Sequence, residues 1–326
     1  MRTGASGPLQ FNPLDLAQEA WKFQQHLAEG MRTLGQLPPD VHYGATEREE
    51  VWRDGKTVLY RFVGDKPATG PALLIVYALV NRPYMVDLQH DRSLVRGLLA
   101  LGMDVYVLDW GYPDRSDRYL ALDDYINRYI DGAVDHLAQA SGGPVNLLGV
   151  CQGGAFSLCY AALHPEKVRN LLTMVTPVDF QTEDNMLSSW VRDLDVDLFV
   201  DALGNVPADL MNASYLMLKP FRLNLQKYVG LVDNLGDPKA VEDFLRMEMW
   251  IFDSPDQAGE AFRDFIKQFY QGNAFINGTA SIGGQAVDLG FVDMPVFNIY
   301  ALQDPLVRPD APRALAGLWA ARTTPN

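Results

Sequence analysis

The sequence predicts an α/β protein in which a mostly parallel sheet carries helices on both faces. Four short, wholly apolar segments have the length of strands buried in such a sheet: residues 72–78, 103–108, 145–150 and 171–175. Segments with helical periodicity separate them. This alternation is typical of a doubly wound fold, in which functional groups lie where strands end and loops begin.

The elements before and between these strands can be assigned in order. An N-terminal helix is expected around residues 14–34. Asp54 and Gly55 then separate residues 50–52 from the alternating run 57–63, a pattern typical of a β-hairpin that enters the sheet antiparallel. The clearest helix places its apolar residues three and four apart on one face: Leu122, Tyr125, Ile126, Tyr129, Ile130, Ala133, Val134 and Leu137.

The pattern changes after the fourth strand. Residues 180–285 consist of helix-like segments rich in Leu, Met, Phe and Trp, and the strand pattern resumes at 295–301. We therefore expect an inserted helical cap. The predicted organisation is an N-terminal helical segment (1–45), the first part of the core (46–180), the cap (181–285) and a C-terminal part of the core (286–326).

Composition limits the possible functions of the 326-residue chain. Its 27 Lys and Arg against 41 Asp and Glu give a net charge of −14, which repels nucleic acid. The longest apolar run, 72–80, is far shorter than the roughly 20 residues of a transmembrane helix. The N-terminus has no apolar stretch of signal-peptide length, so a cytoplasmic location is expected. Cys151 and Cys159 are the only cysteines, which excludes a disulfide framework.

The strongest candidate for chemistry is the segment 149–154, Gly-Val-Cys-Gln-Gly-Gly, between a predicted strand and a predicted helix. It has the pattern of a nucleophile elbow with Cys151 at the strained position, where Gly149, Gly153 and Gly154 allow close backbone approach. The backbone N–H of Gln152 would face a developing oxyanion. The second donor is expected from the loop after residues 72–78, at the N–H of Val80. Cys159 is expected in the core.

With these motifs the sequence resembles the catalytic subunit of class III polyhydroxyalkanoate synthases, members of the α/β-hydrolase superfamily. The similarity spans residues 57–318 and rests on the Cys151 elbow and five further motifs: YALVNRPYM (77–85), LDWG (108–111), TPVDF (176–180), WIFDSPD (250–256) and ALQD (301–304). It implies an α/β-hydrolase fold with an inserted helical cap. It also implies that Cys151 is the nucleophile and Asp304 the triad carboxylate.

The resemblance implies a definite reaction and definite partners. A Cys thiolate takes the acyl group from (R)-3-hydroxyacyl-CoA, most simply 3-hydroxybutyryl-CoA, and the hydroxyl of one acyl unit attacks the next thioester, giving polyester and free CoA. Thiol–thioester exchange keeps the acyl group activated, and a cap that excludes water would protect it. A second, non-catalytic subunit, an oligomer and association with polymer granules are implied. No metal or other cofactor is expected, since CoA arrives with the substrate.

The expected triad histidine is missing from the sequence. The five histidines, His26, His42, His90, His136 and His164, all precede Asp304, whereas the order in this fold is nucleophile, acid, histidine. Beyond Leu318 the chain departs from the family pattern, so a final strand and helix are also expected to be missing. Pro305 stands where the family commonly has His. None of the five histidines is a convincing substitute; His90 is the least implausible.

Three interpretations therefore stay open. The chain is a polymerase whose activity is severely reduced as written, because nothing deprotonates the thiol or the attacking hydroxyl. Alternatively, it is a non-catalytic homologue that binds the partner subunit or the granule. The third interpretation is a Cys-dependent thioesterase or ester hydrolase on the same fold, which would release hydroxyacid instead of extending a polyester.

Overall fold

A seven-stranded sheet organises the residues that the structure, a computed structural model, describes: 43–183, 186–218, 230–231, 234–304 and 306–323. The strand order is β1-β2-β6-β3-β7-β8-β11. β1 (Arg48–Asp54) and β2 (Thr57–Phe62) form the predicted hairpin, and β2 pairs antiparallel with β6 (Asp104–Asp109). The turn residue Gly55 has a positive φ of 58°, which glycine adopts without steric cost.

The other strand pairs are parallel, as the wholly apolar runs predicted. β3 (Ala72–Val76) lies between β6 and β7 (Val145–Val150), and β8 (Val168–Met174) lies between β7 and β11 (Val296–Ile299). All residues of β3 and β7 are buried, because helices cover both faces of the sheet at these central strands. The carboxyl ends of these strands therefore meet at one edge, where the candidate nucleophile follows β7.

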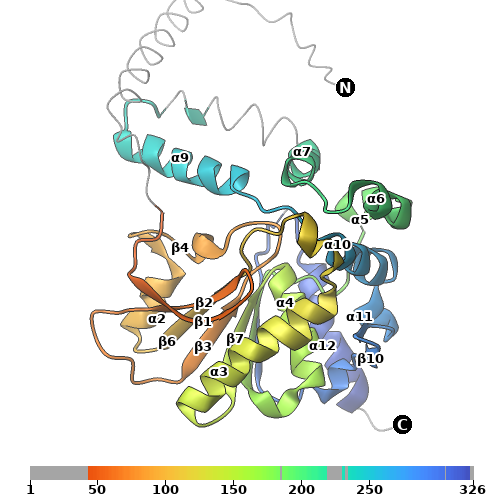
Figure 1. The fold of residues 1–326 in the computed structure, drawn as a ribbon, viewed down its shortest axis with the longest axis horizontal. Helices are drawn as coiled ribbons and strands as arrows, with labels where there is room; N and C mark the ends of the chain where they lie inside the picture. The colour runs from red at the N-terminus through yellow and green to blue at the C-terminus, as the bar shows by residue number, and fades with distance from the viewer. Residues whose placement is uncertain (1–42, 184–185, 219–229, 232–233, 305, 324–326) are drawn as a thin grey trace, which may run out of the picture. The chain divides into compact units, whose positions relative to one another are not determined.

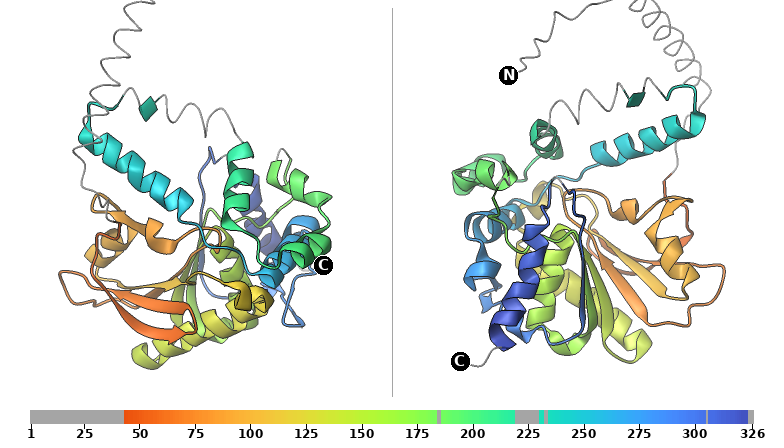
Figure 2. Two further views of the ribbon diagram at one scale, coloured as in Figure 1. Left: turned by 45° about the horizontal axis from the view of Figure 1, so that its top comes forward. Right: turned by 180° about the vertical axis from the view of Figure 1, so that it is seen from behind.

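Successive residues of the central strands pack into two different cores. On one face Leu74, Val76 and Leu147 pack with α3 (Asp131–Ser141), α4 (Gln152–Leu163) and α12 (Asp310–Thr323). On the other face Leu73 and Ile75 pack with α2 (Leu94–Ala100). α4 and α12 lie side by side on their face (Figures 1 and 2). The predicted α/β architecture is confirmed.

The predicted helix of the 122–137 stripe is present, but part of it is wound differently. Asp124–Ile130 is a π-helix, η3, that continues directly into α3. Its residues Tyr125, Ile126, Tyr129 and Ile130 are buried, so the apolar stripe faces the core as expected. The three- and four-residue spacing identifies the buried face but does not distinguish the two windings.

The segment between β8 and β11 is largely helical in its described residues. Its helices are α5 (Met186–Arg192), α6 (Val196–Leu203), α7 (Ala208–Leu218), α9 (Pro238–Phe252), α10 (Gly259–Phe265), the π-helix η6 (Ile266–Gln271) and α11 (Ala274–Asn277). A short hairpin, β9 (Ser281–Ile282) and β10 (Gln285–Ala286), follows. The exact boundaries of the expected cap stay a prediction.

The remaining short elements lie within the core region. They are η1 (Pro83–Val86), β4 (Asp87–Gln89), β5 (Arg92–Ser93), η2 (Arg115–Tyr119), η4 (Pro165–Lys167) and η7 (Leu289–Phe291). None of the helices in the described ranges has the length and hydropathy that a bilayer crossing requires.

The chain divides into two compact units. The larger unit contains residues 43–218 and 250–326, and it includes the sheet and the candidate site. The described residues of the other unit are 230–231 and 234–249, mostly in α9, where Lys239 pairs with Asp243 one turn away. The helix expected at residues 14–34 lies outside the described residues.

The sheet of the described residues ends on β11, an edge strand. Phe297 at its centre is 63% exposed. α12 follows β11 and buries Leu315 in the core beside α4.

Candidate active site

Cys151 occupies a sharp turn between β7 and α4. Its φ of 55° and ψ of −120° are strained for a residue with a side chain, and only Val175 and Asn273 share a positive φ among the non-glycine residues that the structure describes. The Cys151 N–H donates to the carbonyl oxygen of Met174 at 2.8 Å, which ties the turn to the end of β8. This is the geometry of a nucleophile elbow.

Three glycines let the backbone close tightly around this turn. A Cβ on Gly149 would lie 2.4 Å from the Cα of Gly154, and one on Gly154 would lie 1.8 Å from the Oγ1 of Thr176. A Cβ on Gly153 would lie 2.2 Å from the carbonyl oxygen of Val76 at the end of β3. No larger residue fits these three positions without displacing α4 from the sheet.

The loop after β3 is fastened to the elbow by two glutamine side chains. The Leu79 N–H donates to Oε1 of Gln152 at 3.0 Å, and Nε2 of Gln257 donates to the Leu79 carbonyl oxygen at 2.9 Å. Val80, the next residue, lines the same pocket as Cys151 and Gln152. The loop carrying one expected oxyanion donor is thus fixed relative to the residue carrying the other.

Gln257 is a site residue that sequence reasoning missed. It is separated from Leu79 by 178 positions, and it is 4% exposed. Gln257 comes directly after the motif WIFDSPD (250–256). That motif drew attention to this part of the chain but not to Gln257 itself. Because no periodicity or spacing connects two positions so distant in the chain, their contact is visible only in the folded structure.

Asp304 lies beyond the end of β11. Its Oδ1 accepts hydrogen bonds from the backbone N–H groups of Leu306 at 2.8 Å and Val307 at 2.9 Å, which orient the carboxylate. Its negative charge raises the pKa of Cys151, so the two groups are within electrostatic reach of each other. Pro305, singled out in the sequence, lies outside the described residues.

The thiol of Cys151 is held in its protonated form. Burial raises its pKa to about 11, the hydrogen bond from the Gln152 N–H opposes this rise, and Asp304 adds to it. The start of α4 thus favours the thiolate less than burial disfavours it. A group that removes the proton is needed for the sulfur to react near neutral pH.

None of the histidines in the described ranges lies at this pocket. His90 contacts Arg96 through its ring nitrogen at 2.9 Å and lines a different cavity, so the least implausible substitute is excluded. His164 contacts the side-chain oxygen of Asn127 at 3.0 Å and packs against Tyr160. His136 belongs to α3 and is not among the lining residues. His26 and His42 lie outside the described residues.

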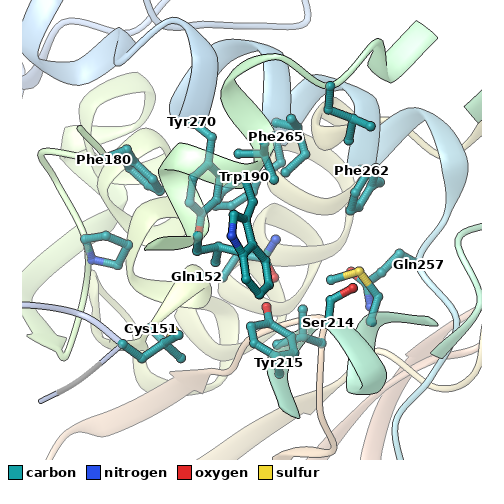
Figure 3. A pocket seen from close by; sticks show the side chains of 18 of the residues that line it. Cys151, Gln152, Phe180, Trp190, Ser214, Tyr215, Gln257, Phe262, Phe265 and Tyr270 are labelled. Carbon is teal, nitrogen blue, oxygen red and sulfur yellow. The ribbon is translucent and has the colours of Figure 1, made fainter. Parts of the chain in front are cut away.

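The Cys151 side chain opens onto a largely apolar pocket with a volume of about 270 Å³ (Figure 3). Helices α5, α6, α7 and α10 and the π-helix η6 supply most of its wall, and α12 contributes Ala311. The apolar lining includes Phe180, Leu187, Trp190, Val191, Leu194, Phe199, Phe262, Phe265 and Ile266. The polar lining groups are few, and Tyr215 and Tyr270 are two that sequence reasoning did not single out.

Comparison with known proteins identifies the family of the chain. Residues 71–325 match the family described as alpha/beta hydrolase fold. The chain is 58% identical over 320 residues to "Poly(3-hydroxyalkanoate) polymerase subunit PhaC" of Allochromatium vinosum, covering 96% of this chain and 89% of the relative. Proteins of the same name from Thiocystis violacea and Synechocystis sp. are 57% and 50% identical, with 97% and 91% of this chain and 90% and 81% of the relative covered. The chain therefore belongs to the family of poly(3-hydroxyalkanoate) polymerase subunits, acyltransferase-type enzymes of the α/β-hydrolase superfamily.

Proposed function

We propose that this chain transfers (R)-3-hydroxyacyl groups, most simply 3-hydroxybutyryl, from CoA to a growing polyester through a thioester on Cys151. The observation that carries the proposal is the strained turn at Cys151 opening onto an apolar pocket, in a chain 58% identical to a named polymerase subunit. CoA is the leaving group of the substrate. No further cofactor takes part.

The first step forms the acyl-enzyme. The Cys151 sulfur, once deprotonated, attacks the thioester carbonyl carbon, and the negative charge that develops on the carbonyl oxygen is stabilised by the backbone N–H groups of Gln152 and Val80. The C–S bond to CoA then breaks, and the CoA sulfur takes up the proton. Free CoA leaves, and the acyl group stays on Cys151.

The second step extends the polyester. The hydroxyl oxygen of one acyl unit attacks the carbonyl carbon of the other thioester, the C–S bond of that thioester breaks, and the hydroxyl proton ends on the departing sulfur. The apolar lining disfavours water as the competing acceptor, since a water molecule there would leave its hydrogen bonds unmade. The pocket therefore favours polymer over hydroxyacid.

Removal of a proton, from the thiol in the first step and from the hydroxyl in the second, limits the rate of both steps. The raised pKa of Cys151 leaves the thiol protonated near neutral pH, and the pocket has no histidine among its described lining residues. Asp304 carries the charge suited to orienting an imidazole, but its own charge disfavours the thiolate. We therefore expect slow turnover, on the scale of the roughly 10⁴- to 10⁶-fold loss that follows removal of a triad member.

A second subunit and the granule surface complete the proposal. The relatives are named as polymerase subunits, which supports an assembly with a further chain. Association with the insoluble polyester follows from the reaction, because the product remains attached to the enzyme while it grows.

The test measures both the acyl-enzyme and the released CoA. The purified chain is incubated with 3-hydroxybutyryl-CoA, the mass of the intact protein is recorded, and free CoA is quantified over time. We expect an added hydroxybutyryl mass that Cys151→Ala abolishes. Cys159→Ala is the matched control. Because Cys159 is fully buried on α4, this variant should still form the adduct on Cys151. Absence of any adduct on Cys151 after prolonged incubation would refute the proposal.

The raised thiol pKa and the histidine-free pocket lining favour one other candidate, a non-catalytic homologue. The same experiment separates the candidates. No adduct and no CoA release would support the non-catalytic function, whereas CoA release with free hydroxyacid and no polyester would support a hydrolase. Adding a family-type C-terminal segment with its histidine should restore sustained turnover if the polymerase function is correct.

A further inference from the structure

Most polar side chains of the Cys151 pocket are already engaged. The Ser214 hydroxyl donates to the carbonyl oxygen of Leu210 at 2.9 Å. Oε1 of Gln152 accepts a hydrogen bond from the backbone N–H of Leu79, and Nε2 of Gln257 donates one to the Leu79 carbonyl oxygen. These groups fix the protein's own backbone, so they contribute little to recognition of a substrate hydroxyl.

Two phenol groups differ from them. Tyr215 of α7 and Tyr270 of η6 both line the pocket, and neither hydroxyl has a hydrogen-bond partner among the residues that the structure describes. Figure 3 shows the two side chains entering the pocket from opposite walls, with their oxygens directed inward. A largely apolar pocket thus presents two hydroxyls that no described residue pairs with.

Both hydroxyls lie within electrostatic reach of the nucleophile. Burial raises the pKa of both phenols, and the charge of an ionised Cys151 adds to the rise at Tyr215 and, after that of Tyr215, at Tyr270. Burial is the larger cause in both cases, and it keeps the two phenols protonated over the working pH range. They therefore act as hydrogen-bonding groups and do not replace the missing base.

The chemistry of a hydroxyacyl unit fits this pair. When such a unit is bound at Cys151, its hydroxyl enters an apolar cavity, where an unpaired hydroxyl is costly. A hydroxyl has one proton to donate and lone pairs to accept with. Two protonated phenols match both needs, since one donates a hydrogen bond to the substrate oxygen and the oxygen of the other accepts a hydrogen bond from the substrate hydroxyl.

We propose that the hydroxyls of Tyr215 and Tyr270 form a subsite that binds the 3-hydroxyl group of the acyl unit at Cys151. The inference rests on the proposed function and names residues that select its substrate class. It explains how an apolar pocket distinguishes a hydroxyacyl thioester from a plain acyl thioester of the same length. A site built to pair with a hydroxyl rejects the analogue that lacks it.

The test compares two thioesters in a protein that cannot consume them. In the Cys151→Ala background, dissociation constants are measured by calorimetry for (R)-3-hydroxybutyryl-CoA and butyryl-CoA. We expect roughly 10- to 100-fold tighter binding of the hydroxylated thioester, on the scale of the cost of unpaired buried groups. Tyr215→Phe and Tyr270→Phe should each reduce this ratio about tenfold by weakening only hydroxybutyryl-CoA binding. Tyr119→Phe, a change at a 70% exposed position, should leave the ratio unchanged.

The outcomes separate the subsite from the reaction. Equal binding of the two thioesters, or a ratio that both Phe variants retain, would overturn the subsite, even if the intact chain still forms the acyl-enzyme on Cys151. A hydroxyl preference that the Phe variants remove would support the subsite, even if the intact chain forms no acyl-enzyme and the proposed function fails. Each Phe variant loses one oxygen atom only, and an unchanged melting temperature shows that it folds.

Discussion

Replacing Gly153 by alanine should destabilise the protein severely, because the new Cβ meets backbone atoms that cannot rotate away. It would lie 2.2 Å from the carbonyl oxygen of Val76 and 2.6 Å from that of Tyr77, whereas real Cβ contacts are essentially never closer than 3.0 Å. The start of α4 must therefore move by about 0.8 Å or more. Val76 is held by pairing with β6 and β7, so the strand cannot yield easily.

The expected cost lies at the upper end of the range for overpacking, about 3 kcal/mol. At roughly 2–4 °C per kcal/mol for a large domain, the melting temperature should fall by roughly 6–12 °C. The assay is thermal unfolding followed by circular dichroism. The displacement of α4 also moves the Gln152 N–H, so acylation of Cys151 should slow in the fraction that remains folded.

Gly97→Ala is the matched control. Gly97 lies inside α2, and a Cβ there would meet nothing within 4 Å. Because alanine is favoured over glycine within a helix by up to about 1 kcal/mol, the melting temperature should stay constant or rise slightly. A Gly153→Ala protein that melts within 2 °C of the parent would refute the steric reasoning, since the contacts would then be relieved at no cost.

Three further changes test the electrostatics and hydrogen bonds of the site. Asp304→Asn removes a negative charge that raises the pKa of Cys151, so the thiolate fraction at pH 8 and the rate of iodoacetamide labelling, followed by mass spectrometry, should both increase. Asp109→Asn leaves the Arg82 guanidinium, which is 2.7 Å away on a side chain only 12% exposed, without its counter-charge, which should lower the urea-derived unfolding free energy by about 3–5 kcal/mol. Gln257→Leu leaves the Leu79 carbonyl oxygen unpaired, so stability should fall by about 1–3 kcal/mol and acylation should slow.

Each of these changes has a control of the same chemistry. Asp310→Asn, at a 72% exposed side chain, should not alter labelling. Asp54→Asn breaks an exposed pair with Arg128 and should cost less than about 1 kcal/mol. Gln285→Leu, at an exposed position of β10, should melt like the parent. An equal response of a test variant and its control would contradict the interaction expected at that site.

The labelling experiment also has a pH profile with a definite sign. With a pKa of about 11, Cys151 gains thiolate as the pH rises, and its labelling rate should still be increasing above pH 10. A plateau near pH 8 would show an ordinary thiol pKa and contradict the effect of burial. Cys159, fully buried, should remain unlabelled in the folded protein.

Local hydrophobic patterns were enough to predict the architecture, because buried strands and helices each leave a characteristic spacing of apolar residues. The wholly apolar runs became β3, β6, β7 and β8, and the predicted hairpin formed, with its turn at Gly55 and Lys56 and with Asp54 as the last residue of β1. The elbow could also be located, since its glycines, the preceding strand and the following helix are contiguous in the chain. The winding of η3 could not be determined, because α- and π-helices bury the same stripe of residues there.

How distant residues combine around Cys151 is visible only in the folded chain. The approach of Gln257 to Leu79, the facing phenols of Tyr215 and Tyr270, and the exclusion of His90 all depend on packing between segments far apart in the sequence. The pKa of the Cys151 thiol also depends on packing, since burial raises it by more than the backbone N–H at the start of α4 lowers it. A local pattern specifies which groups are present, whereas their distances and their exposure to water arise only when the chain folds.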